Sequence, residues 1–130
     1  MMRDVTCPIV RRASAVLAFR HPLAGLQLVK RGVEAGETPA AATLRELREE
    51  SGVAGRVPVP LAVRDDLHPG EHWHLIVVWT GSRPDRWVRR TADDGGQDFA
   101  FFWQVEGDPE EGFDARYRRV LACLRTGAAA

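Results

Sequence analysis

The segment that most constrains the fold of this chain is a capped helical stretch, residues 38–52 (TPAAATLRELREESG). Thr38 and Pro39 are typical of a helix start, because a hydroxyl side chain caps free backbone N–H groups and proline fits the first helical position. Gly52 is typical of a helix end, because glycine readily adopts the left-handed conformation. We therefore predict a helix over about residues 38–51.

The predicted helix places three carboxylates on one face. At about 100° per residue, Glu46, Glu49 and Glu50 fall within an arc of about 100°, on a different face from the apolar positions. Neighbouring like charges repel one another, and the helix dipole disfavours anions in the last turns. A bound divalent cation would remove this repulsion, and clustered oxygen ligands suit magnesium or manganese. The alternative is a solvated helix face whose charges pair with one another.

The rest of the chain alternates between strand patterns and turns. Strand patterns cover residues 13–20, 26–30, 57–66, 72–80, 87–90 and 98–105, and an amphipathic helix covers residues 113–125. Two prolines in the third pattern predict a strand at a sheet edge. This order predicts a single α/β domain over residues 1–130, with helices packed against a mixed sheet. We expect residues 1–12 and 126–130 to form a flexible arm and tail.

Composition excludes several classes of partner. The chain has 130 residues, with 18 basic and 18 acidic side chains, so it carries no net charge to attract duplex nucleic acid. No apolar run approaches the roughly 20 residues of a membrane span. The two cysteines, Cys7 and Cys123, are too few for a disulfide framework or a zinc site. We expect unpaired thiols and a cytoplasmic location.

Residues 31–53 resemble the Nudix box, G-x5-E-x7-R-E-U-x-E-E-x-G-U, in which U is an aliphatic residue. Every fixed position from Glu37 to Val53 matches in residue type and spacing. The first glycine is replaced by Arg31, and Gly32 follows it. The resemblance implies a Nudix-like α/β/α sandwich with a mixed sheet. It also implies that a homodimer is to be considered, because Nudix proteins often dimerise.

By this resemblance, the activity is metal-dependent hydrolysis of a pyrophosphate bond in a nucleoside diphosphate linked to another group. The substrate would be a small-molecule diphosphate, and the cofactor would be Mg2+ or Mn2+. Glu49 and Glu50 would be the main metal ligands, with Glu46 as a further ligand or as the base for water. Arg45 would orient the carboxylates, and Glu37 would support Arg45.

The resemblance also suggests positions around the glutamates. The backbone carbonyl of Lys30 would help to bind metal. The side chains of Lys30 and Arg31 would contact phosphate oxygens, or would be a solvated strand end. Asp93 or Asp94 would supply a further acidic group, although Asp and Gly are also ordinary turn residues.

A second hypothesis belongs to a different functional class. The chain would be a catalytically weak Nudix-fold module that binds a nucleotide or a partner without hydrolysing it. Arg31 is the sequence feature that favours this alternative, whereas the complete set of glutamates favours the enzyme.

Overall fold

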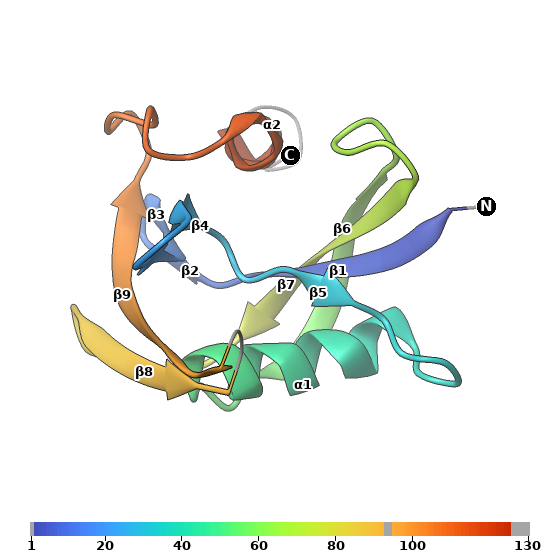
Figure 1. The fold of residues 1–130 in the computed structure, drawn as a ribbon, viewed down its shortest axis with the longest axis horizontal. Helices are drawn as coiled ribbons and strands as arrows, with labels where there is room; N and C mark the ends of the chain where they lie inside the picture. Colours follow the sequence, from blue (N-terminus) through green and yellow to red (C-terminus); the bar gives the residue numbers. More distant parts are fainter. Residues whose placement is uncertain (1, 93–94, 126–130) are drawn as a thin grey trace.

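The computed structural model describes residues 2–92 and 95–125, which form two helices and two sheets (Figure 1). The helices are α1 (Pro39–Ser51) and α2 (Ala115–Arg125). The strands are β1 (Arg3–Ile9), β2 (Arg11–Arg12), β3 (Ala15–His21), β4 (Gly25–Gln27), β5 (Arg31–Gly32), β6 (Arg56–Arg64), β7 (Glu71–Trp79), β8 (Trp87–Thr91) and β9 (Gln97–Val105). Neither helix in the described part of the chain is long and apolar enough to cross a membrane.

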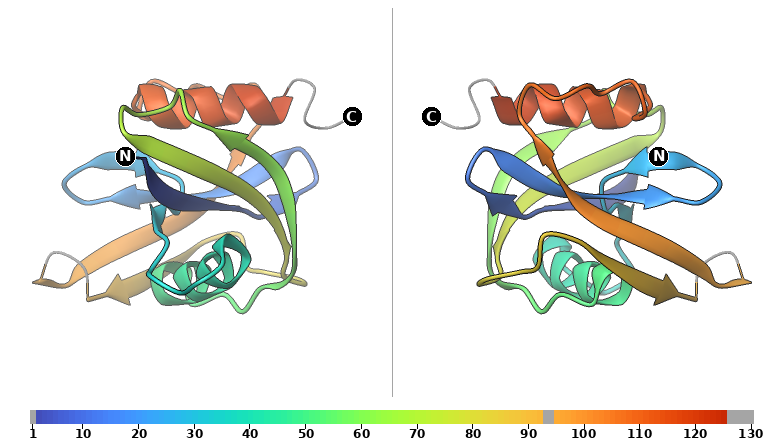
Figure 2. Two further views of the ribbon diagram at one scale, coloured as in Figure 1. Left: turned by 90° about the vertical axis from the view of Figure 1, so that its right-hand side faces the viewer. Right: turned by 90° about the vertical axis from the view of Figure 1, so that its left-hand side faces the viewer.

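One sheet is mixed and the other is antiparallel. The mixed sheet has the order β5-β1-β7-β6, in which β1 and β7 run parallel and the other neighbours run antiparallel. The antiparallel sheet has the order β2-β3-β9-β8, with β4 also paired to β3. Figure 2 shows α1 and α2 on opposite sides of the strands. The predicted α/β fold with a mixed sheet is confirmed, and β6 is the predicted edge strand.

Helix α1 begins and ends where the sequence predicts. The Thr38 hydroxyl accepts a hydrogen bond of 3.1 Å from the Ala41 N–H, and Gly52 has φ of 79° at the C-terminal cap. Leu47 is fully buried on the face that packs against the sheets. The Thr43 hydroxyl, also buried, forms a hydrogen bond with Thr6 of β1. These contacts fix both the axial position and the rotation of the helix, and so they fix the direction in which its carboxylates point.

Residues 3–9 form a central strand, whereas we expected residues 1–12 to be a flexible arm. β1 pairs with β7 along its whole length, from Arg3 opposite Glu71 to Ile9 opposite Val77. The pairing partners are 68 residues apart in the chain, so no local pattern could reveal them. Pairing on both sides buries most of this strand despite its polar residues. The expected tail, residues 126–130, lies outside the described residues.

Each helix covers its own apolar cluster. Helix α2 contributes Tyr117, Val120, Leu121 and Leu124 to a cluster that includes residues of β1 and β7. Helix α1 contributes Leu47 to a second cluster, with aromatic residues of β3 and β9. The segment between β4 and α1 therefore lies between elements that each of these clusters holds in place. This segment carries Lys30, Arg31 and Glu37.

Candidate active site

Glu46, Glu49 and Glu50 face a common cavity of about 430 Å³, which we call the carboxylate cavity. Its walls come from β5 and the loop after it, from the last turns of α1 and from the end of β8. The lining residues are Arg31, Glu34, Arg45, Glu46, Glu49, Glu50, Arg89, Arg90, Thr91 and Ala92. The structure thus brings the three predicted glutamates together with arginines from three separate segments.

Two of the three carboxylates are buried. Glu46 and Glu50 are 6% and 5% exposed, whereas the Glu49 side chain is 60% exposed. Burial raises the pKa of Glu46, although its hydrogen bond to Arg45 opposes this shift. Burial also raises the pKa of Glu50, against the neighbouring charge of Arg31. Because desolvation outweighs the paired arginine at both positions, additional positive charge would stabilise both carboxylates.

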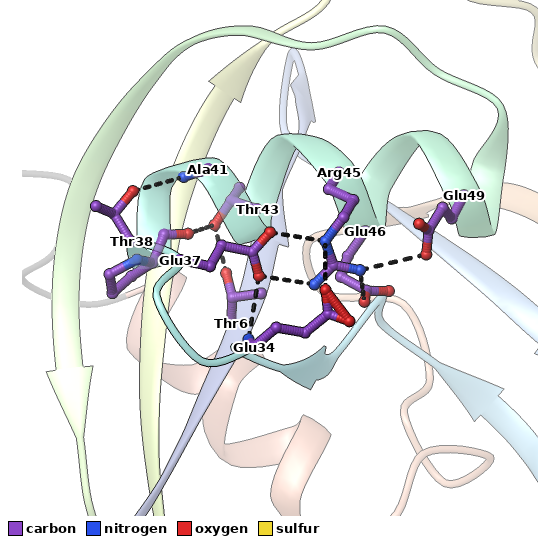
Figure 3. A network of polar contacts seen from close by, with 10 residues as sticks. Thr6, Glu34, Glu37, Thr38, Ala41, Thr43, Arg45, Glu46 and Glu49 are labelled. Carbon is purple, nitrogen blue, oxygen red and sulfur yellow. Dashed lines mark hydrogen bonds and ion pairs between the residues drawn. The ribbon is translucent and has the colours of Figure 1, made fainter.

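Arg45 connects the glutamates of the helix to the loop before it (Figure 3). Its Nε and Nη2 atoms donate to the two carboxylate oxygens of Glu37 at 2.7 and 2.8 Å. Its Nη1 atom donates to Glu46 at 2.5 Å and to Glu49 at 3.3 Å. The hydrogen bonds from Arg45 lower the pKa of Glu37 to about 2. Glu37 therefore holds Arg45 in place, and Arg45 orients the two helical carboxylates.

Arg31, which replaces the first glycine of the box, fits its position without backbone strain. Neither Arg31 nor Gly32 has a positive φ, and both pair with β1. The Arg31 Nε atom lies 3.1 Å from the Oε1 atom of Glu50. At Gly32, an added Cβ would lie 2.4 Å from a side-chain nitrogen of Arg3, so a larger residue there would require the flexible Arg3 side chain to shift. The substitution therefore leaves the backbone path intact and places a guanidinium group on a buried glutamate.

The carboxylate cavity fits a divalent cation by its chemistry. Three carboxylates share it, and the two buried ones lack full charge compensation. In the described residues, however, no group of three His, Cys, Asp or Glu side chains is arranged to hold a metal ion. Arg45 and Arg31 instead hold Glu46 and Glu50. Metal binding thus requires a rearrangement of these ion pairs, and the Lys30 carbonyl stays a predicted ligand.

The Lys30 side chain lies in a second cavity of about 430 Å³, which we call the basic cavity. Arg31 and Glu50 line both cavities. The Lys30 ammonium lies 5.6 Å from the centre of the Trp73 ring, and burial together with the charge of Arg116 lowers its pKa. Arg31 therefore borders both cavities, whereas Lys30 lines the basic cavity and not the carboxylate cavity.

Four basic residues of the site were not expected from the sequence. Arg89 and Arg90 of β8 line the carboxylate cavity, and Arg3 and Arg116 line the basic cavity. The adjacent arginines of β8 were visible as a charged pair on a predicted strand, but nothing placed that strand beside α1. The predicted acidic residues 93 and 94 lie outside the described residues.

Comparisons with known proteins agree with this fold. A family model described as NUDIX domain matches residues 1–122. A crystal structure of an ADP-ribose pyrophosphatase from Streptococcus suis superposes with a TM-score of 0.71 at 11% identity, covering 98% of this chain and 94% of that one. A MutT NUDIX hydrolase from Burkholderia pseudomallei gives 0.68 at 22% identity, covering 94% and 97%. A NUDIX-family hydrolase from Clostridium perfringens gives 0.68 at 14% identity, covering 99% and 97%. No curated protein matches the sequence.

Proposed function

The chain belongs to the NUDIX domain family, and we propose that it is a hydrolase that cleaves a pyrophosphate bond in a nucleoside diphosphate linked to another group. The observation that carries this proposal is the carboxylate cavity, in which three glutamates from one helix face arginines of β5 and β8. Carboxylates suit a divalent cation, and the arginines suit the anionic oxygens of a diphosphate. One cavity thus contains carboxylates that suit the metal ion and arginines that suit the diphosphate.

In this proposal, Glu49 and Glu50 hold Mg2+ or Mn2+, and Glu46 is a further ligand or the base for the attacking water. The bound cation would offset the negative charge that develops on the phosphate oxygens and would acidify water. Arg45 fixes the orientation of Glu46 and Glu49, and Glu37 fixes Arg45 through two hydrogen bonds. Arg31 contributes to phosphate binding once it has left Glu50.

The substrate in this proposal is a small-molecule diphosphate, and the protein acts in the cytoplasm, where its two free cysteines would stay reduced. A homodimer stays a prediction that rests on the family resemblance. The alternative function is a nucleotide-binding module with little turnover. The ion pair between Arg31 and Glu50 favours this alternative, because the arginine competes with a metal ion for a predicted main ligand.

The test is release of phosphate and nucleoside monophosphate from a panel of nucleoside diphosphate derivatives, including ADP-ribose. Wild type, Glu50→Gln and Glu111→Gln are assayed with magnesium, with manganese and with chelator. Glu111 is an exposed glutamate outside both cavities, so its variant controls for the loss of one negative charge.

We expect metal-dependent turnover that falls at least about 100-fold in Glu50→Gln and stays unchanged in Glu111→Gln, because losing a metal ligand removes several kcal/mol of transition-state stabilisation. Turnover that is independent of metal, or equal in both variants, would contradict the assignment of Glu50. Metal binding without turnover of any compound would favour the binding module.

A further inference from the structure

The basic cavity concentrates positive charge, which the hydrolytic chemistry at the glutamates does not require. We propose that it binds an additional phosphate group of the substrate, beyond the bond that is cleaved. The proposal rests on the proposed function, since it places the diphosphate at the glutamates. It narrows the substrate class to diphosphate compounds that carry a further phosphate, such as nucleoside triphosphates or phosphorylated conjugates.

The charge of this cavity is concentrated against a neutral background. The chain as a whole has 18 basic and 18 acidic residues. The basic cavity is nevertheless lined by four cationic side chains and by one carboxylate, Glu50. The four cationic residues are Arg3, Lys30, Arg31 and Arg116. These residues come from β1, the β4–β5 connection, β5 and α2, so the fold itself gathers them from distant parts of the sequence. Such a concentration of one sign of charge raises the local concentration of anions.

Lys30 is the member of this set with the least compensation. Arg3 forms an ion pair with Glu71 at 3.2 Å, and Arg116 with Asp114 at 2.6 Å. The Lys30 ammonium faces the Trp73 ring and forms no hydrogen bond or ion pair with any residue that the structure describes, and only the charge of Glu71 offsets it from beyond ion-pair distance. Burying a cation costs free energy unless an anion or hydrogen-bond acceptors replace its water. A phosphate group in the cavity would supply both.

The aromatic residues of the cavity do not form a platform for a nucleotide base. Phe19 and Phe99 stack on each other with ring centres 4.4 Å apart, and each is only 2% exposed. Tyr117 is also 2% exposed. Their faces are therefore occupied by core packing. Apart from His21, Gln27 and two small or aliphatic residues of the β3–β4 turn, the remaining lining groups are the four cationic side chains and Glu50, which favours an anionic group over a base in this cavity.

The two cavities adjoin through Arg31 and Glu50, which line both. A diphosphate held at the glutamates therefore has one end directed to the basic cavity. The volume of about 430 Å³ lies in the range of small-molecule sites and exceeds the needs of one phosphate group. Arg3 and Arg116 keep N–H donors beyond those that contact Glu71 and Asp114, because a guanidinium group carries five.

The first test measures anion binding without metal, so it does not depend on catalysis. Inorganic tripolyphosphate is titrated calorimetrically into metal-free wild type, Lys30→Met, Arg3→Met and Arg56→Met. Methionine keeps much of the apolar stem and removes the charge. Arg56 is exposed on the edge strand β6 and serves as the control. We expect the dissociation constant to rise about tenfold in Lys30→Met and Arg3→Met, the usual size for a lost charge-assisted contact, and to stay unchanged in Arg56→Met.

The second test compares two substrates that differ by one phosphate. The ratio of kcat/KM for ATP to that for ADP is measured with magnesium for wild type and Lys30→Met. We expect wild type to prefer the triphosphate and the variant to lose about tenfold of that preference. Equal tripolyphosphate binding by wild type and both cavity variants would overturn the proposal. If tripolyphosphate binding depends on Lys30 but neither ATP, ADP nor any compound of the nucleoside diphosphate panel is hydrolysed under any metal condition, the anion site stands and the proposed function fails.

Discussion

Arg31 is the residue at which this chain departs from the Nudix box, and its effect is electrostatic. Its backbone lies in a regular strand pair with β1, so the lost glycine changes no turn. Its guanidinium group instead neutralises part of the charge of Glu50. Without this arginine, burial would raise the pKa of Glu50 further. The arginine thus acts as a resident counter-ion in the carboxylate cavity. A metal ion has to compete with it.

Replacing Arg31 by methionine should therefore strengthen metal binding. The competing hydrogen bond is charge-assisted, which is worth about 1.5–3 kcal/mol, so we expect the dissociation constant for Mn2+ to fall about tenfold. The measurement is a calorimetric or magnetic-resonance titration of Mn2+ in the absence of substrate. Methionine is preferred to glycine because it leaves the strand conformation unchanged.

Arg31→Lys and Arg56→Met provide the comparison. The lysine variant keeps a cation near Glu50 and should bind Mn2+ about as wild type does, and the remote variant should not differ from it. If Arg31→Met bound Mn2+ no better than Arg31→Lys, the ion pair would not be a competitor, and the rearrangement inferred for Glu50 would be unnecessary.

At the scale of the element, α1 could be predicted closely and β1 could not. The limits of α1 are determined by the residues next to its ends, because Thr38 caps its start and Gly52 caps its end. The conformation of β1 depends on β7, which lies far along the chain. Its sequence contains Arg, Asp, Thr and Pro, which are not a strand pattern until the pairing partner is known. Local signals therefore located the glutamates correctly but not the strand that supports their helix.

The cap of α1 should contribute measurably to stability. The Thr38 hydroxyl accepts the Ala41 N–H at 3.1 Å, and α1 positions all three glutamates. We expect Thr38→Ala to lower the free energy of unfolding by about 1 kcal/mol, with little change in Thr38→Ser, which keeps the acceptor. Urea denaturation of both variants measures the difference. An alanine variant as stable as the serine variant would show that packing alone fixes the helix start.

At the scale of the molecule, the site combines segments that sequence analysis could not bring together. Glu37, Arg45 and the three helical glutamates lie within one motif, and the contacts of Arg45 with Glu37 and Glu49 were within reach by its spacing. Arg3 and Arg116 lie near opposite ends of the chain, and they meet at the basic cavity because β1 occupies the middle of the mixed sheet while α2 covers one side of the strands. This convergence is a property of the topology, not of any local pattern.

Because β1 is buried, the free energy of unfolding of the molecule should decrease at alkaline pH. Cys7 of β1 is fully buried, and desolvation raises its pKa from 9.0 to about 12, with the charge of Lys30 opposing the shift. Between these values the folded chain keeps a proton that the unfolded chain loses, so stability falls as pH rises from about 9 towards 12. Each pH unit in this window costs about 1.4 kcal/mol.

Denaturation at about pH 8 and about pH 10 should therefore show a loss of roughly 1 kcal/mol that is attributable to this thiol. Other groups also titrate in this range, so the informative quantity is the difference between wild type and Cys7→Ala, which should lack this part of the pH dependence. Cys123→Ala is the matched control, because it removes the other cysteine and leaves Cys7 in place, so the part of the pH dependence that Cys7 causes should remain. If Cys7→Ala lost stability with pH as steeply as wild type, the Cys7 thiol would be accessible to hydroxide without unfolding, and β1 would have to open independently of the strands on either side of it.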